Sequence, residues 1–246
     1  MDQRHKIANY RDSHASENYG GLYNSKYSSG YYYRQWEDVE KKILVESVKR
    51  FASREAEVLD FACGTGRISV VVAQHVGHVM GVDVSGAMLA SATRAHNVTY
   101  LQHDLTGKGL GKTFDLITSF RFFLNAEQLL REQALAALHA HLKDDGYFIF
   151  NVHMNSRSIV GRIISGLSRV TTRFYHKILS ESEVRTLLKR AGFEIVEVRY
   201  YSFLPRLGGK VGDALSVLMK GVESVANALP VPRSLGQSFI VVARKR

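Results

Sequence analysis

The sequence predicts an α/β protein built on a doubly wound, mostly parallel sheet with a Rossmann-like strand and helix arrangement. Two observations lead to this prediction. Short apolar segments rich in Val, Ile, Leu and Phe alternate with helical segments from residue 57 to residue 152, and such alternation is typical of parallel sheets. A glycine-containing turn, residues 62–66, also joins the first strand to the first helix of this series.

Seven segments are expected to be strands, and they are 57–62, 78–83, 98–102, 114–120, 146–152, 193–201 and 238–244. The helices between them are indicated by apolar residues at three- and four-residue spacing, and they are about 36–51, 67–76, 85–96, 126–142, 157–174, 181–191 and 209–229. Ser85 is a predicted N-cap. Ser180 and Glu183 form a predicted capping box, and Gly192 ends the helix that they open.

The chain is expected to be one domain with appendages. Residues 1–33 hold seven of the twelve tyrosines and almost no branched aliphatic residues, so they cannot bury a core of their own. We predict that they form an N-terminal arm or lid. The main domain spans residues 34–246, with helical insertions at about 156–191 and 203–235 that interrupt the strand and helix alternation.

Composition narrows the class of protein. No apolar run reaches the ~18 residues of a spanning helix, and the first ten residues lack the apolar core of a signal peptide. The single cysteine, Cys63, fits a reducing compartment, so we expect a cytoplasmic protein, with peripheral contact to the inner membrane face as an alternative. The formal net charge of +10 is compatible with nucleic acid, an anionic membrane or an acidic small substrate.

The turn after the first strand carries the main functional signal. Gly64 and Gly66 allow a tight turn and close backbone approach to a ligand, and the helix that follows offers free N–H groups. A dinucleotide fingerprint would have a third glycine where Ser69 stands. Asp83 ends the second strand, where a carboxylate can accept hydrogen bonds from ribose hydroxyls, and Asp104 ends the third strand, within reach of an adenine amino group.

These segments resemble the class I S-adenosylmethionine-dependent methyltransferases. E-V-L-D-F-A-C-G-T-G is similar to the family's first motif, G-V-D-V-S-G-A-M-L to its second and Q-H-D-L to its third. The resemblance covers about residues 35–152 and the closing strand pair, and it implies seven strands with the last one reversed. It also implies a set of residues that contact S-adenosylmethionine or its product S-adenosylhomocysteine, namely Asp60, Ala62, Gly64, Gly66, Asp83, Val84, Met88, Asp104, Leu105, Ser119 and Tyr33.

The acceptor is expected beyond the carboxyl ends of the fourth and fifth strands. Residues 118–125 contain neither the paired prolines of exocyclic-amine DNA methyltransferases nor the carboxylate of metal-dependent enzymes, so no metal is predicted. Two candidate catalytic residues lie here. Arg121 could hold an acceptor carboxylate or phosphate. His153, which alternates with Asn151 and Asn155, could act as general base.

The resulting hypothesis is methyl transfer to a small molecule. The segments F-R-F-F-L-N and F-N-V-H-M-N are similar to methyltransferases of bacterial polysaccharide and natural-product pathways. This favours a hydroxyl on a sugar or on another anionic or amphiphilic metabolite, with a lipid-linked acceptor as an alternative. Amine methylation of an amino sugar stays open. A nucleic-acid-binding or nucleic-acid-modifying protein is the competing class, less favoured because the sequence has no separate basic domain or tail.

Two further expectations concern the appendages. The arm, with Tyr31, Tyr32, Tyr33 and Trp36, is expected to cover the cofactor pocket and exclude water.

The segment between Asp145 and Glu181 contains no acidic residue, whereas it contains five lysine and arginine residues. An apolar stripe with arginines nearby can pack on the domain or lie on a membrane surface.

Overall fold

The computed structural model describes residues 19–170, 178–204 and 209–246 of the chain. A seven-stranded sheet runs through them in the order β3-β2-β1-β4-β5-β7-β6. The strands are β1 (Glu57–Phe61), β2 (His78–Asp83), β3 (Val98–Gln102), β4 (Phe114–Ser119), β5 (Leu142–Val152), β6 (Phe193–Tyr201) and β7 (Ser238–Lys245). All seven predicted strands are present.

Strands β1 to β5 pair in parallel, and β7 runs antiparallel to both β5 and β6. The predicted doubly wound sheet with a reversed last strand is therefore confirmed. The chain order changes direction between β1 and β4, which is the topological switch point where open α/β sheets bind ligands. The carboxyl ends of β1, β2 and β4 consequently define the place to look for a site.

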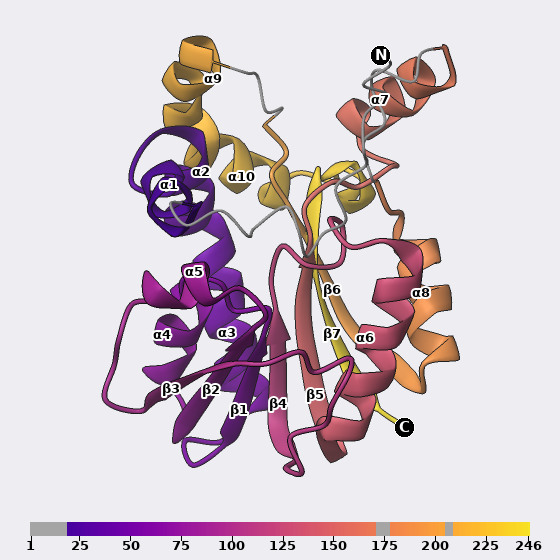
Figure 1. The fold of residues 1–246 in the computed structure, drawn as a ribbon. Helices are drawn as coiled ribbons and strands as arrows, with labels where there is room; N and C mark the ends of the chain where they lie inside the picture. Colours follow the sequence, from indigo (N-terminus) through magenta and orange to yellow (C-terminus); the bar gives the residue numbers. More distant parts are fainter. Residues whose placement is uncertain (1–18, 171–177, 205–208) are drawn as a thin grey trace, which may run out of the picture.

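Helices cover both faces of the sheet (Figure 1). They are α1 (Tyr19–Lys26), α2 (Gly30–Arg34), the π-helical segment η2 (Gln35–Glu40), α3 (Lys41–Phe51), α4 (Arg67–Ala73), α5 (Gly86–Ala90), α6 (Gln128–His141), α7 (Ile159–Val170), α8 (Glu181–Arg190), α9 (Gly209–Leu215), the 3-10 turn η4 (Ser216–Leu218), α10 (Met219–Ala228) and the 3-10 turn η5 (Arg233–Leu235). Two apolar clusters fill the space between helices and sheet, one on each face.

Several helices differ from their predicted bounds. Helix 85–96 is only α5, because the chain turns at Ser91 and continues as a loop. The first long helix begins at Gly30 rather than near Trp36, so the end of the predicted arm belongs to it. The segment 209–229 is broken by η4, and residues 171–174 of the predicted helix 157–174 lie outside the described residues. The caps predicted at Ser85 and Ser180 are confirmed by their hydrogen bonds.

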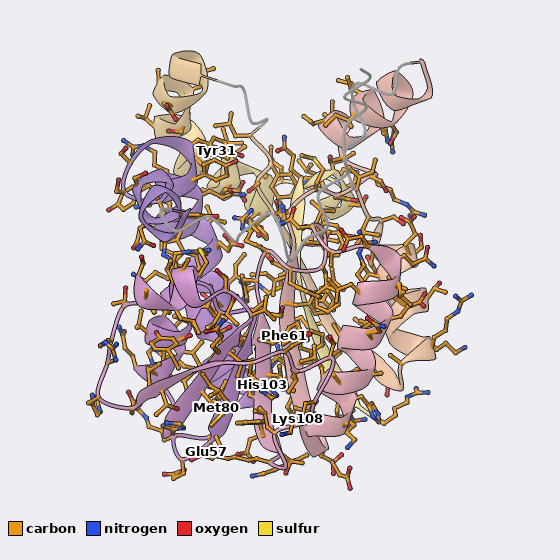
Figure 2. All side chains as sticks on the ribbon, viewed as in Figure 1. Tyr31, Glu57, Phe61, Met80, His103 and Lys108 are labelled. Carbon is orange, nitrogen blue, oxygen red and sulfur yellow. The ribbon has the colours of Figure 1, made fainter. Side chains whose placement is uncertain are left out.

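Three labelled side chains in Figure 2 show the direction in which the parallel strands run. Glu57 marks the amino end of β1, Phe61 its carboxyl end, and Tyr31 lies further on in the same direction, among the helices that precede the sheet. Helices α7, α9 and α10 also stand at the carboxyl end of the sheet (Figure 1). The parts of the predicted insertions that form α7, α9 and α10 are thus on the side where ligands bind, whereas α8 packs beside β6. Across the described residues, no helix is long and apolar enough to cross a membrane.

Candidate functional site

The turn between β1 and α4 is held in a conformation that only certain residues adopt. Ala62, Gly64 and Gly66 all have positive φ, at 56°, 57° and 74°. A Cβ atom at Gly66 would also collide with the hydroxyl of Tyr100. Glycine at this position is therefore required both by backbone geometry and by space.

Asp83 ties this turn to the end of β2. Its Oδ2 accepts a hydrogen bond from the Gly64 amide at 2.8 Å, and its Oδ1 accepts one from the Ser85 amide at 2.9 Å. An ionised carboxylate has about four acceptor positions, so these two bonds orient the group without exhausting its capacity. Asp83 can accept further hydrogen bonds from a ligand.

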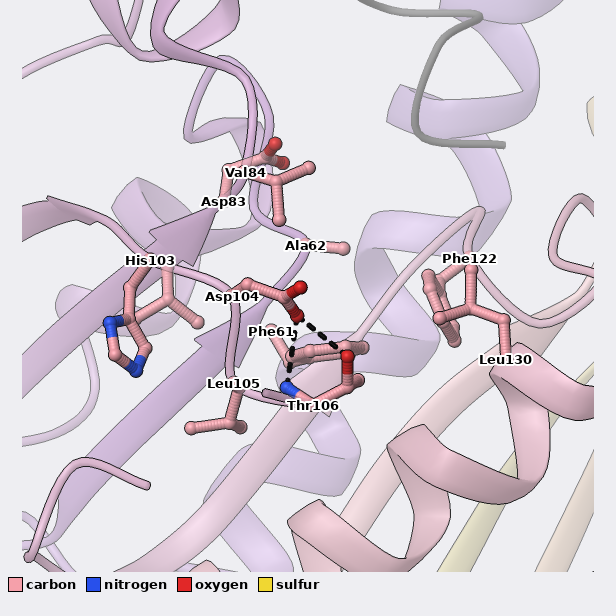
Figure 3. Close-up of a pocket in the computed structure, with 11 residues that line it drawn as sticks. Phe61, Ala62, Asp83, Val84, His103, Asp104, Leu105, Thr106, Phe122 and Leu130 are labelled. Carbon is pink, nitrogen blue, oxygen red and sulfur yellow. Dashed lines mark hydrogen bonds between the residues drawn. The ribbon is translucent and has the colours of Figure 1, made fainter. Parts of the chain in front are cut away.

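A pocket opens beside this carboxylate (Figure 3). The space between its walls is about 360 Å³, a volume that includes open solvent. Its lining residues come from the ends of β1 and β2, the loop after β3, the loop after β4 and helix α6, and they are Phe61, Ala62, Val82, Asp83, Val84, His103, Asp104, Leu105, Thr106, Phe122 and Leu130. Five of the predicted cofactor residues are thus brought together: Ala62, Asp83, Val84, Asp104 and Leu105.

Asp104 is oriented within the pocket by its own loop. Its Oδ1 accepts hydrogen bonds from the Thr106 amide at 3.0 Å and the Thr106 hydroxyl at 2.6 Å (Figure 3). This is a local side-chain turn, and it fixes the carboxylate before any ligand arrives. Asp83 and Asp104 together give the pocket two acidic acceptors.

Asp60 is placed differently from these two acids. It is buried and is not among the residues that line the pocket. Its carboxylate accepts hydrogen bonds from the hydroxyls of Ser69, at 2.5 Å, and Thr118, at 2.8 Å. Burial raises the pKa of Asp60 to about 6, against the opposing effect of these two hydrogen bonds. Its position links α4 and β4 behind the glycine turn.

Three further predicted cofactor residues, Met88, Ser119 and Tyr33, are not among the residues that line the pocket. Met88 is buried, and a Cβ at Gly64 would meet its methyl group at 2.9 Å. Ser119 is fully buried at the end of β4, and its hydroxyl has no hydrogen-bond partner among the described residues. Tyr33 is 42% exposed. Direct contact of Met88, Ser119 and Tyr33 with a cofactor stays a prediction.

The N-terminal arm contacts the glycine turn and the helix after it. The Thr65 hydroxyl donates a hydrogen bond to the Asn24 side-chain oxygen at 2.7 Å. The guanidinium of Arg67 stacks between the rings of Tyr27 and Trp36, at 4.2 and 4.1 Å from their centroids. Two stacking contacts of this kind favour a fixed position for the arm. Its described part, from Tyr19 onward, therefore lies against the segment that carries the site.

Arg121 lies in a buried polar network. Its Nη2 donates a hydrogen bond to Oε2 of Glu40 at 3.0 Å, and the Glu40 side chain is fully buried. Oε1 of Glu40 accepts hydrogen bonds from Asn151 Nδ2 at 2.5 Å and from the Tyr201 hydroxyl at 2.8 Å. The Arg121 amide donates to Asn151 Oδ1 at 2.7 Å, although Arg121 itself has a positive φ of 66°. The network joins η2 to the ends of β4, β5 and β6.

The three polar residues expected on one side of β5 have separate surroundings. Asn151 belongs to the Glu40 network, whereas Asn155 donates to the carbonyl oxygens of Ser234 and Gly236, at 2.7 and 3.0 Å. His153, just beyond the end of β5, is half-buried. Asn155 is a structural anchor, because both of its donors are used on η5 and the residue that follows it. His153 as general base stays a prediction.

Sequence reasoning missed two groups of residues. The first group lines the pocket and consists of Phe61, Val82, His103, Thr106, Phe122 and Leu130. All of them except Leu130 are next to a predicted site residue in the sequence, and that position was the available signal. Glu40 and Tyr201 gave none, since they lie 111 and 50 residues from Asn151. Cys63 is buried in the glycine turn, and its burial raises the pKa of the thiol, which disfavours the nucleophilic thiolate.

Comparison with known proteins gives a consistent result. Residues 58–146 match the family model described as a methyltransferase domain. The dTDP-3-amino-3,6-dideoxy-alpha-D-glucopyranose N,N-dimethyltransferase of Streptomyces fradiae is 33% identical over 43% of this chain and 43% of its own length. The ubiquinone biosynthesis O-methyltransferase of Rickettsia typhi is 25% identical over 76% of this chain and 82% of its own. The chain spans about half the length of the relatives that it matches at more than 30% identity.

The fold points the same way. The crystal structure of magnesium protoporphyrin IX methyltransferase from Synechocystis PCC 6803 with bound S-adenosylhomocysteine superposes with a TM-score of 0.63, at 16% identity, and covers 96% of this chain and 97% of that one. The family model matches the segment that contains the glycine turn, and the structural comparison covers nearly the whole chain. Residues 58–146 are therefore similar to a methyltransferase domain, and the sheet has the fold of the solved methyltransferase structure that it resembles.

Proposed function

We propose that this protein transfers the methyl group of S-adenosylmethionine to a hydroxyl of a small acceptor, a sugar or another anionic or amphiphilic metabolite. The observation that carries the proposal is the pair of carboxylates, Asp83 and Asp104, that face one pocket beside the glycine turn. A pocket with two fixed acidic acceptors suits a ligand that has ribose hydroxyls, an adenine amino group and a positive charge.

The residues present fit S-adenosylmethionine. The hydrogen bonds that hold Asp83 leave its carboxylate able to accept from ribose hydroxyls. The apolar side chains of Phe61, Val84 and Leu105 line the same pocket and can contact a flat base. When bound, the cofactor supplies an electrophilic methyl group on a sulfonium. The chain's own residues bind and orient it, exclude water and take up the acceptor proton.

The acceptor chemistry is proposed from the acceptor side of the sheet and from the relatives. A hydroxyl must lose its proton as the methyl arrives, and the imidazole of His153 beyond β5 is the group we propose to take it. The O-methyltransferase relative from Rickettsia typhi supports a hydroxyl. The N,N-dimethyltransferase relative from Streptomyces fradiae supports an amino sugar as the second candidate, for which proximity alone can suffice.

We also propose that the reaction needs no metal. The loop after β4, residues 120–125, carries no carboxylate that could ligate one beside the acceptor. Dialysis against a chelator should leave turnover unchanged, and restored activity on adding Mg²⁺ or Zn²⁺ to a dialysed, inactive protein would contradict this part of the proposal.

Calorimetry tests the cofactor half of the proposal. Asp83→Asn keeps the shape of the side chain and removes its charge, so S-adenosylmethionine should bind roughly 10- to 100-fold more weakly, equivalent to one charge-assisted hydrogen bond of about 1.5–3 kcal/mol. Asp144→Asn is the matched control, because the Asp144 side chain is 96% exposed at the opposite edge of the sheet. Tight binding of NAD without binding of S-adenosylmethionine would overturn the proposal.

A labelling experiment tests the acceptor half. The protein is incubated with methyl-labelled S-adenosylmethionine and with polar, lipid and nucleic-acid fractions of a cell extract. We expect label in the polar or lipid fraction. Release of the label as methanol in mild base identifies a methyl ester, and retention of the labelled product on a cation exchanger separates a methylamine from a methyl ether. Label confined to nucleic acid would favour the competing class.

A further inference from the structure

Helix α10 turns its apolar stripe toward solvent. Leu218, Val225 and Leu229 lie at helical spacing and are 54%, 56% and 54% exposed. The adjacent face of the helix buries Met219, Ala226 and a carboxylate, that of Glu223. An ordinary surface helix buries its apolar stripe and exposes its charges. Glu223 is fixed inward because its Oε1 accepts a hydrogen bond from the Phe203 amide at 2.7 Å, so the inverted orientation is set by the protein itself.

Helix α7 shows the same inversion. Ile159 and Ile163, four residues apart on one face of the helix, are 60% and 57% exposed. Gly161 faces inward, where a Cβ would collide with the carbonyl oxygen of Asn155. The first turn of α7 therefore packs closely on the domain at Gly161. Ile159 and Ile163 are on the side exposed to solvent.

The charges around these stripes are positive. Arg157 and Arg162 are exposed at the start of α7, and Lys220 and Arg233 are exposed on and after α10. No acidic residue occurs anywhere from Gly146 to Ser180. Around α10, Glu223 is buried, and Asp213 accepts a hydrogen bond from the Tyr31 amide at 2.9 Å. The two stripes therefore combine exposed apolar side chains with basic ones.

Figure 1 shows α7 and the α9–α10 pair on two sides of one end of the molecule, both beyond the carboxyl ends of the strands. We propose that the stripes Ile159–Ile163 and Leu218–Val225–Leu229 form a docking surface for an anionic phospholipid bilayer. This inference rests on the proposed function in one respect only: docking on that surface would bring the acceptor side of the sheet to the membrane, where an amphiphilic acceptor resides.

A bilayer explains the arrangement better than a protein partner does. Two separate apolar helices that project from one end can both enter the fluid interface of a membrane, whatever the distance between them. A folded partner would need two apolar surfaces at one matching separation. Basic residues beside apolar ones match the negative surface potential of anionic lipids, and this complementarity extends over both helices.

Vesicle sedimentation tests the proposal on the full chain without cofactor or acceptor. The protein should bind vesicles of phosphatidylglycerol and phosphatidylcholine, and much less to phosphatidylcholine alone. Binding should weaken as NaCl is raised, because surface charges are screened. The double variant I159S/I163S and the double variant V225S/L229S should each lower the partition coefficient about tenfold or more. Arg162→Gln should lower it about fivefold.

Matched controls come from surfaces away from this end. Val196→Ser removes an exposed apolar side chain, 44% exposed near the amino end of β6, and Arg190→Gln removes an exposed arginine on α8. Both should bind vesicles like the wild type. All replaced residues are exposed, so the variants should keep the wild-type circular dichroism and S-adenosylmethionine affinity. Those two measurements separate lost docking from lost folding or lost cofactor binding.

Three outcomes would overturn the docking proposal. The first is absence of binding to anionic vesicles. The second is equal loss of binding in the control variants, which would mean non-specific charge attraction by the whole protein. The third is a wild-type dimer that I159S/I163S converts to monomer without any vesicle binding, which would make the stripes an interface between copies. Vesicle binding without labelled product would instead refute the proposed function and leave docking intact.

Discussion

Arg121 lies at the end of β4, where the sequence placed it, but its guanidinium is paired with Glu40. The sequence indicated an arginine at the acceptor end of β4 that could hold an anion. In the structure its guanidinium is 13% exposed and is paired with the fully buried Glu40. A buried charge that loses its partner is strongly destabilising. Any effect of Arg121 on an acceptor therefore has to be separated from its effect on the fold.

The first prediction follows from this pairing. Arg121→Gln should lower the free energy of unfolding by about 3–5 kcal/mol, because Glu40 would stay buried without its cation. Urea denaturation measures the change. Arg190→Gln, which replaces an exposed arginine, should stay within about 0.5 kcal/mol of the wild type. Wild-type stability in the Arg121 variant would mean that the pair contributes little and that Arg121 is available to an acceptor.

His153 carries the second prediction. If the acceptor is a hydroxyl, His153→Ala should lower kcat roughly 10²- to 10⁴-fold and leave the affinity for S-adenosylmethionine unchanged, since His153 is not among the residues lining the cofactor pocket. His96→Ala is the control, because His96 is exposed just before β3, at the amino edge of the sheet. Near-normal turnover of the His153 variant would favour an amine acceptor.

At the scale of elements, the N-terminal arm is the segment most closely tied to the site. Its contacts are Asn24 on Thr65 and the rings of Tyr27 and Trp36 around Arg67. Thr65 and Arg67 flank Gly66, the residue that closes the glycine turn. Because these contacts are made beside the glycine turn, a movement of the arm would change the access of solvent to the site, as a lid does.

The third prediction tests the lid. Deleting residues 1–28 removes α1 and Tyr27 and leaves α2, η2 and the Trp36 stack. The core should remain folded, with circular dichroism like that of the full chain. The KM for S-adenosylmethionine should rise about tenfold or more as water enters the site. Unchanged kinetic constants in the truncated protein would contradict the lid hypothesis.

Helix α10 gives the fourth prediction, a dependence of stability on pH. Burial raises the pKa of Glu223 from 4.5 to about 7, against hydrogen bonds from the amides of Phe203 and Ser202. A carboxyl whose pKa is raised by folding holds its proton better in the folded state, so its contribution to stability is greatest below pH 4.5. That contribution is lost as the pH rises from about 4.5 to about 7.

Glu223→Gln removes this titration and keeps an oxygen that can accept from both amides. The unfolding free energy of the wild type minus that of the variant should therefore fall by on the order of 2–3 kcal/mol between pH 4.5 and 7.5. Chemical denaturation across this range measures it. Glu37→Gln, on the half-buried Glu37–Lys41 pair, serves as the control and should show no comparable fall. A pH-independent difference for Glu223→Gln would contradict the prediction.

At the scale of the whole molecule, cofactor binding should stabilise the fold. The pocket is built from the ends of β1, β2 and β3 together with α6, so it exists only when the sheet has assembled. A ligand at 100 times its Kd adds about 2.7 kcal/mol to the unfolding free energy. For a chain of this size that corresponds to a rise in Tm of roughly 5–10 °C.

Differential scanning fluorimetry with S-adenosylmethionine or S-adenosylhomocysteine should show this fifth predicted effect, and NAD at the same concentration should leave Tm unchanged. Asp83→Asn should need a higher cofactor concentration for the same shift. A rise in Tm with NAD alone would show that the pocket prefers a dinucleotide.

The sequence by itself determined the sheet, the glycine turn and the acids at the strand ends. These features are local: strands and helices follow from apolar periodicity, and Gly64 and Gly66 are required by the backbone at their own positions. Parallel strands place their carboxyl ends at one edge, so Asp83 and Asp104 meet in one pocket as expected.

Only the tertiary structure decided which polar groups are paired and which apolar ones are left exposed. Glu40 accepts hydrogen bonds from Arg121, Asn151 and Tyr201, which are 81, 111 and 161 residues away in the sequence. No local sequence pattern predicts contacts over such separations. The stripe Leu218–Val225–Leu229 reads in sequence like the buried side of a helix, yet it faces solvent because Glu223 is held inward by the end of β6. Periodicity shows that a helix has two faces, whereas long-range packing determines which face the protein covers.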